Sequence, residues 1–174
     1  DPADPLSFVF FTDNAASGYN YGLEAEMAWQ IDRRWRIDGS VALLRTQYDR
    51  FESPTVAIEG REQAHAPGYQ FAIAVTYRAP SGFFARADYQ GRGGFYFDDS
   101  HNQRSEPYEL AHLRVGYERE RWSASLWVRN VFDETYAVRG FYFSNDPNDP
   151  EFLPELFTRL GDPRQYGLTL TYSL

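Results

Sequence analysis

Apolar and polar residues alternate along most of this chain, and the alternation constrains the fold more than any other feature. Between residues 20 and 30, Leu23 and Trp29 share one parity, whereas Glu24 and Glu26 share the other. Successive side chains of a strand point to opposite faces, so this segment is predicted to be a strand with one apolar and one polar face. The pattern recurs at 34–48, 68–78, 83–97, 108–118, 121–130 and 163–174. With a short first strand near 6–11, the sequence predicts an all-β chain of about eight antiparallel strands of membrane-spanning length.

The connections between these segments alternate between short and long. Residues 31–34, 79–82 and 118–121 form short links, whereas 49–67, 98–107 and 138–163 are long, polar stretches that include Pro, Asp or Asn. Outer-membrane β-barrels sort their connections in this way, with short turns on the periplasmic side and long loops on the cell surface. The pattern therefore predicts a transmembrane barrel whose long segments, including 138–163, lie outside the cell.

Aromatic residues make up 18% of the chain and gather at the predicted strand ends, which suggests two girdles at the two membrane interfaces. The girdle beside the short links would contain Trp29, Trp35, Tyr77, Phe83, Tyr117, Trp122 and Tyr172. The girdle at the opposite ends would contain Tyr48, Phe51, Tyr69, Phe95, Phe97, Phe132 and Tyr136. A soluble β-sandwich that binds carbohydrate also alternates along its strands, and it stays open as an alternative.

Composition excludes several functions. The net charge of −8 argues against a nucleic-acid partner, which would need a basic surface. The chain contains neither Lys nor Cys, so lysine and thiol chemistry are excluded. The acidic stretches at 98–101 and 145–151 lack the spacing of a calcium loop, and no nucleophile stands in a catalytic context. We therefore expect no enzyme activity, no cofactor and no metal site.

Two stretches near the C-terminus resemble the last part of TonB-dependent outer-membrane receptors. The first is the segment from Asn130 to Tyr136, with Val131, Phe132 and Asp133, and the second contains Gly161, Pro163 and Arg164. Earlier stretches resemble the same family in the same order. They contain Gly22, Leu23 and Glu24, and then Ala66, Pro67, Tyr69 and Phe71.

The resemblance implies structural roles for these residues. Phe132 and Tyr136 would anchor a strand end at the outer interface, while Asn130 and Asp133 would satisfy main-chain groups where the strand ladder ends. The final strand resembles the signal read by the barrel-assembly machinery. It carries Tyr172 and ends in Leu174, where the family usually has Phe.

The resemblance also implies a function. Residues 1–174 would be the C-terminal barrel segment of a receptor in the outer-membrane lipid, without its plug domain and TonB box; contact with the TonB complex would require that N-terminal part. Such a receptor imports a scarce ligand such as a ferric siderophore. Its binding residues here would be Arg92, Tyr96, His101, Arg139, Phe141 and Tyr142. The alternative is a small outer-membrane barrel that closes alone and has a structural or adhesive role.

Overall fold

A computed structural model describes residues 17–51, 56–145, 151 and 153–173 of the chain. These residues form antiparallel strands and connections, with no helix among them that is long and apolar enough to cross a membrane. The strands are β1 (Ser17–Gln30), β2 (Trp35–Arg50), β3 (Tyr69–Arg78), β4 (Phe83–Arg92), β5 (Tyr108–Glu118), β6 (Trp122–Arg129), β7 (Ala137–Phe143), β8 (Glu155–Leu160) and β9 (Gln165–Tyr172). The predicted short strand near 6–11 lies outside the described residues.

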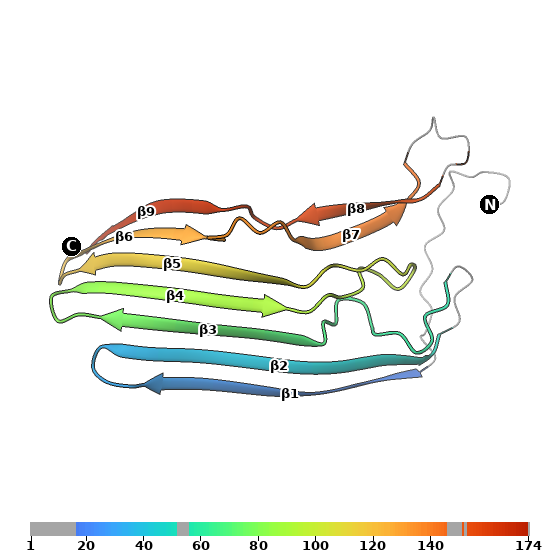
Figure 1. Ribbon diagram of the computed structural model, residues 1–174, viewed down its shortest axis with the longest axis horizontal. Coiled ribbons are helices and arrows are strands. Elements are labelled where there is room, and N and C mark those ends of the chain that lie inside the picture. Colours follow the sequence, from blue (N-terminus) through green and yellow to red (C-terminus); the bar gives the residue numbers. More distant parts are fainter. Residues whose placement is uncertain (1–16, 52–55, 146–150, 152, 174) are drawn as a thin grey trace.

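Seven strands form one sheet in the order β1-β2-β3-β4-β5-β6-β9, and β7 and β8 form a separate pair (Figure 1). The short connections 31–34, 79–82 and 119–121 lie together at one end of the sheet, which we call the turn end. The connecting residues 56–68 and 93–107 lie at the opposite end with the β7–β8 hairpin (Figure 1), and we call this the loop end. The predicted sorting of short and long connections is therefore confirmed.

The strand register joins the apolar residues into one continuous face. Val75 pairs with Ile37 and Ala87, and Leu126 pairs with Val115 and Leu168. These side chains are not covered by a second layer, since Leu126 is 60% exposed. Leaving a fully apolar side chain in water costs about 1.5–3 kcal/mol, so a whole face of them indicates that lipid is its solvent.

The soluble β-sandwich alternative is therefore wrong. A sandwich would bury this apolar face against a second sheet. Among the described residues, only Ala74 and Leu110 of the seven-stranded sheet are buried apolar residues. The large side chains that are fully buried, Ile58 and Phe95, come from the connections at the loop end.

The predicted girdle at the turn end is present on the apolar face. The rings of Trp35 and Tyr77 lie 4.8 Å apart, and those of Tyr117 and Trp122 lie 5.9 Å apart. Trp122 pairs across the sheet with Tyr172, the girdle residue of the last strand. An aromatic belt of this kind is typical of a membrane interface.

The predicted girdle at the loop end is largely wrong. Phe95 and Phe97 are buried among the connections, and Tyr48 shares the parity of Ser40 and Ala42 on the polar face of β2. Of the residues predicted for this belt, Tyr69 and Phe132 remain exposed. The aromatic residues exposed toward the loop end are Tyr21, Tyr69, Phe132 and Tyr166, whereas Tyr89 stands opposite Ile73 near the middle of β3. The sequence could not separate these sets, because parity cannot be followed through irregular connections.

Residues 138–163 are not one irregular loop, and this prediction was wrong. β7 and β8 pair across them, with Phe141 opposite Phe157, and they lie beyond the loop ends of β6 and β9 (Figure 1). The segment from Asn130 to Tyr136 is the break between β6 and β7. It therefore divides one long hairpin into a membrane part and an outer part.

Candidate functional site

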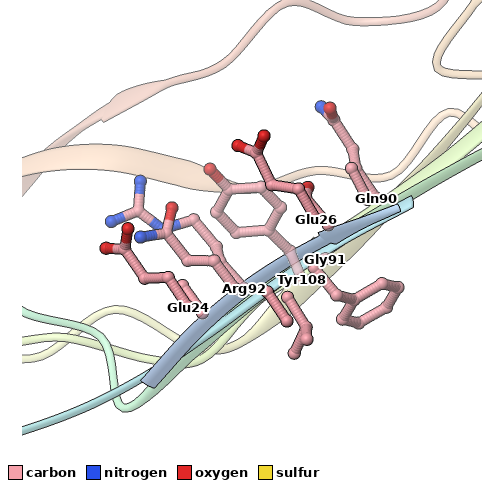
Figure 2. A pocket seen from close by; sticks show the side chains of 13 residues that line it. Glu24, Glu26, Gln90, Gly91, Arg92 and Tyr108 are labelled. Atoms are coloured by element: carbon pink, nitrogen blue, oxygen red, sulfur yellow. The ribbon is translucent and has the colours of Figure 1, made fainter. Parts of the chain in front are cut away.

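The polar face of the sheet forms a hollow inner wall (Figure 2). Glu24, Glu26, Gln90, Arg92 and Tyr108 extend from this face, which also carries Ser40, Ala42, Gln70 and Ala72. The register explains why these residues meet, because Glu24 pairs with Ala42 and Arg92 pairs with both Gln70 and Tyr108. Because side chains alternate along each strand, the apolar residues lie on the lipid side, and the acidic, amide and basic residues lie together on one concave surface.

The charged side chains of the inner wall form ion pairs toward the turn end, whereas the carboxylates in the hollow do not. Toward the turn end, Arg86 lies 2.7 Å from Asp88 and 4.0 Å from Asp38. In the hollow, Glu24 and Glu26 have no ion-pair partner among the residues that the structure describes. Carboxylates without a cationic partner remain available as hydrogen-bond acceptors for a polar ligand.

Arg92 is the cation of this hollow. Its guanidinium carbon lies 4.4 Å from the centre of the Phe95 ring and 6.0 Å from that of Tyr108. Its Nε is buried and has no hydrogen-bond partner within the described part of the chain. An arginine held by rings rather than by carboxylates keeps its donors for an incoming anion.

The connections at the loop end pack into one body, which we call the loop cluster (residues 56–67 and 93–107). Arg61 joins its two halves, because its guanidinium donates to the main-chain oxygens of Asp98 and His101 over 2.9 and 2.6 Å. It also lies 3.3 Å from a carboxylate oxygen of Asp99. The cluster is also joined to β2, because the Tyr48 N–H donates to the Arg61 main-chain oxygen over 3.0 Å.

Aromatic rings fill the interior of the loop cluster. Phe95 and Phe97 meet edge to face with centroids 5.6 Å apart, and both are almost fully buried. The predicted ligand residue Tyr96 lies between two cations, 4.5 Å from Arg61 and 5.3 Å from Arg104. The Tyr96 ring is therefore part of the packing that holds the cluster together.

The β7–β8 hairpin packs on the loop cluster through two contacts. The Phe97 ring lies against Gly140 so closely that a Cβ there would fall 2.3 Å from a ring carbon. The His101 ring lies 5.5 Å from that of Tyr142. Burial lowers the pKa of His101, with Arg61 acting in the same direction and Asp98 opposing it, so the neutral ring is favoured.

The structure thus divides the six predicted ligand residues. Arg92 lines the hollow, whereas Tyr96 and His101 pack within the loop cluster. Tyr142 joins His101, while Arg139 lies 5.0 Å over the ring of Phe141. Arg139 and Phe141 are exposed on the hairpin and do not reach the lining of the hollow.

Sequence reasoning missed several residues of this site. Glu26 and Tyr108 line the hollow, and the parity of their strands would have identified them as polar-face residues. The sequence around Arg61 does not indicate its role, because its hydrogen-bond partners lie 37 to 41 residues away in another connection.

Asn130 hydrogen-bonds main-chain groups at the end of β6. Its side-chain nitrogen donates to the main-chain oxygens of Glu134 and Asp162, and its side-chain oxygen accepts from the Glu134 N–H. Asn130 and Asp133 adopt positive φ angles of 49° and 58°, a conformation that Asn and Asp tolerate better than most residues. The Asp133 carboxylate also accepts from the Arg164 N–H over 2.8 Å. These bonds satisfy main-chain groups where the ladder is interrupted.

The remaining residues of the motif have different positions from one another. Phe132 is 73% exposed, as a membrane anchor requires. Tyr136 was predicted to anchor a strand end at the outer interface, but it does not lie at the lipid surface. Its ring lies 4.4 Å from that of Tyr108, which belongs to the inner wall, and it covers Gly161 closely. Pro163 is exposed beside Arg164, Tyr172 is exposed opposite Trp122, and Leu174 lies outside the described residues.

One sheet with a lipid-facing outer surface, aromatic rings at both ends and a polar inner wall defines a wall segment of a transmembrane β-barrel. Residues 1–131 match the family described as TonB dependent receptor-like, beta-barrel. The chain therefore belongs to this family of outer-membrane receptors.

Solved structures with a similar fold support this assignment. The ferric yersiniabactin uptake receptor FyuA from Yersinia pestis superposes with a TM-score of 0.72 at 21% identity, over 89% of this chain and 23% of that one. The siderophore receptor PiuA from Acinetobacter baumannii gives 0.72 at 13% identity, over 89% and 22%. The ferric-catecholate import receptor Fiu from K12 E. coli, in its closed form, gives 0.67 at 19% identity, over 89% and 21%. The chain thus spans less than a quarter of the length of these receptors.

Proposed function

We propose that this chain forms part of the barrel wall of a receptor that imports a scarce ligand such as a ferric siderophore, in a TonB-dependent manner. The observation that carries the proposal is the hollow of the inner wall, where Arg92 and Tyr108 face Glu24 and Glu26. Arginine donors suit the anionic groups of an iron chelate, and the Tyr108 ring offers a surface for a planar group.

The loop cluster supports the same proposal. Arg61 joins residues 98–101 to the connection that follows β2, and the Tyr48 N–H of β2 donates to the Arg61 main-chain oxygen. A ligand that reached the hollow from outside would pass this cluster and the hairpin packed on it. We therefore propose that Arg139, Phe141 and Tyr142 contact the ligand during entry, while Arg92 contacts it in the hollow.

We further propose that this wall segment closes only with other strands of a larger barrel. β1 and β9 form the two edges of the seven-stranded sheet, and unpaired strand edges are not tolerated in lipid. The remaining strands, a plug domain and a TonB box would come from the rest of the receptor, and the last strand, with Tyr172 and Leu174, would be read by the assembly machinery. No catalytic step is part of this proposal.

Uptake of radioactive iron by iron-starved cells tests the function. The full receptor is deleted and restored, and iron is offered as a catecholate, a hydroxamate and a citrate complex. We expect one complex to depend on the receptor, and Arg92→Gln to weaken its binding by about tenfold, the effect of losing a charged hydrogen bond. Arg36→Gln is the control, since Arg36 lies on the same face but is paired with Asp38 at 2.6 Å. Uptake of all three complexes without the receptor would contradict an iron-chelate substrate.

A further inference from the structure

The inner wall of β5 and β6 carries a second group of side chains, which we call the arginine–indole strip (Arg114, Trp127 and Arg129). Trp127 shares the parity of the buried Ser125, whereas the adjacent Leu126 faces lipid. The strand register places Trp127 beside Arg114 of β5. None of the three residues of the strip lines the hollow described above.

The indole of Trp127 is held against the wall by β9. Its Nε1 donates to the Thr169 hydroxyl over 3.1 Å. Its six-membered ring covers Gly167, where a Cβ would collide with three of the ring atoms. Because one face of the ring lies on the main chain of β9, the opposite face is directed into the barrel. That face offers a fixed surface on which a planar group can stack.

The two arginines of the strip lie beside this ring without an anion. The guanidinium carbon of Arg129 lies 5.1 Å from the centre of the Trp127 ring. Arg114 Nε donates to the Ser125 hydroxyl over 3.0 Å, which is an uncharged partner. Both arginines are exposed, and neither forms an ion pair with any residue that the structure describes. Their remaining donors are therefore available to an anionic ligand.

The position of Arg114 makes the missing anion significant. Arg114 stands directly opposite Arg86 in the register of β4 and β5, and like charges in such a position are destabilising. Arg86 is neutralised by Asp88 at 2.7 Å. Arg114 has no such partner and is an exception to the ion pairing toward the turn end. An anion bound at Arg114 would remove the repulsion between the two arginines.

The strip lies deeper in the barrel than the hollow. Strand β5 runs from the loop end to the turn end, and Tyr108, which lines the hollow, precedes Arg114 in it. At about 3.3 Å per residue, Arg114 lies about 20 Å nearer the turn end than Tyr108. The charges also differ, because the hollow contains Glu24 and Glu26, whereas the strip contains cations alone.

We propose that the arginine–indole strip is a second binding site for the imported ligand, which it contacts after the hollow on the way to the periplasm. This role rests on the proposed function and narrows it to one class of ligand, an anionic chelate that carries a planar aromatic ring. Arg114 and Arg129 donate hydrogen bonds to its anionic oxygens, while the aromatic ring stacks on Trp127.

Iron-starved cells that carry the full receptor test this role, with radioactive iron offered as a dihydroxybenzoate complex and as a citrate complex. Binding is measured on energy-depleted cells, and uptake is measured on respiring cells. The double change Arg114→Gln, Arg129→Gln should leave binding unchanged but slow uptake of the dihydroxybenzoate complex by about tenfold, the effect of losing a charged hydrogen bond. Trp127→Leu should slow the same uptake by about fivefold, because ring stacking is lost.

Arg78→Gln is the matched control, because Arg78 lies on the same inner wall but is paired with Glu118 at 2.8 Å. It should leave binding and uptake unchanged. Equal uptake by the double variant and the wild type would overturn the second site, although the proposed function would stand. Receptor-dependent uptake of the citrate complex alone would also overturn it, since citrate has no ring. If neither complex depends on the receptor, the proposed function fails for these chelates and the second site fails with it.

The heat-induced shift on gels shows whether each variant assembles. If the double variant does not, Arg114→Gln alone is measured in its place. Variant cells that admit a large antibiotic excluded by the wild type would overturn the second site as well. The arginines would then hold another part of the receptor that blocks the barrel, rather than a passing ligand.

Discussion

Arg61 and His101 are 40 residues apart in the chain, yet the Arg61 guanidinium donates to the His101 main-chain oxygen over 2.6 Å. The same guanidinium reaches Asp98 and Asn102, so one buried cation holds a whole turn of the neighbouring connection. Arg61 therefore makes several of the hydrogen bonds that join the two halves of the loop cluster.

Replacing Arg61 by Met should loosen the loop cluster without unfolding the barrel wall. The change leaves the buried oxygens of Asp98 and His101 without a charged donor, and each such bond contributes about 1.5–3 kcal/mol. Amides of residues 93–107 should exchange hydrogen faster, while the heat-induced shift of the receptor on gels stays unchanged.

Arg104→Met is the control for this experiment. Arg104 also lies over Tyr96, but its ion pair with Glu62 is half exposed, and surface pairs contribute little. Equal acceleration of exchange in both variants would contradict a special role for Arg61.

The loop cluster should loosen as the pH falls below about 6.5, the ordinary pKa of histidine. Burial lowers the pKa of His101, so the packed cluster binds fewer protons than the opened one in this range, and its stability rises with pH. The charges next to His101 do not change in this range, because Arg61 stays cationic and Asp98 stays ionised. Burial alone would raise the pKa of Asp98, but hydrogen bonds from Ser100 lower it.

Hydrogen exchange between pH 7.5 and 5 measures this effect, with His101→Asn as the comparison. Asn can offer an acceptor where His101 Nδ1 accepts the Gln103 N–H, but it does not titrate. His65 also lies in the cluster, so only the difference between wild type and variant reports on His101. An identical pH dependence in both proteins would refute the prediction.

Replacing Ile73 by Arg should destabilise the assembled barrel by about 2–4 kcal/mol, the cost of a cation on the lipid face near mid-membrane. The adjacent Ala72→Arg should cost much less, because Ala72 lies on the inner wall beside Ser40 and Gln90. Urea unfolding of the receptor in lipid vesicles measures both. Similar losses for the two variants would contradict the assignment of the faces.

Replacing Asn130 by Asp should destabilise the junction between β6 and β7 by about 1–3 kcal/mol. The variant keeps a residue type that tolerates positive φ and an oxygen for the Glu134 N–H, but it loses both donors to main-chain oxygens. The temperature of heat-induced unfolding should fall, whereas Glu134→Ala should leave it unchanged, since Asn130 contacts only the main chain of Glu134. An unchanged temperature in Asn130→Asp would mean that the junction is held by other contacts.

The sequence by itself determined the seven-stranded wall and its two faces. Leu23 faces lipid and Glu24 faces the inner wall because side chains of a strand alternate with period two, a local property that needs no knowledge of neighbours. The network of Asn130 was also predictable, because a short polar side chain at the end of a ladder hydrogen-bonds nearby main-chain groups.

Only the tertiary structure decided what happens at the loop end. The Pro- and Asp-rich composition of 138–163 suggested an irregular loop, but β7 and β8 pair across it and Gly140 accepts the ring of Phe97. The Tyr136 ring lies at the inner wall because Gly161, which has no side chain, leaves space for it. The hydrogen-bond partners of Arg61 lie in a different connection. These outcomes depend on contacts between distant segments, and neither local propensity nor period-two parity carries information about which distant segments meet.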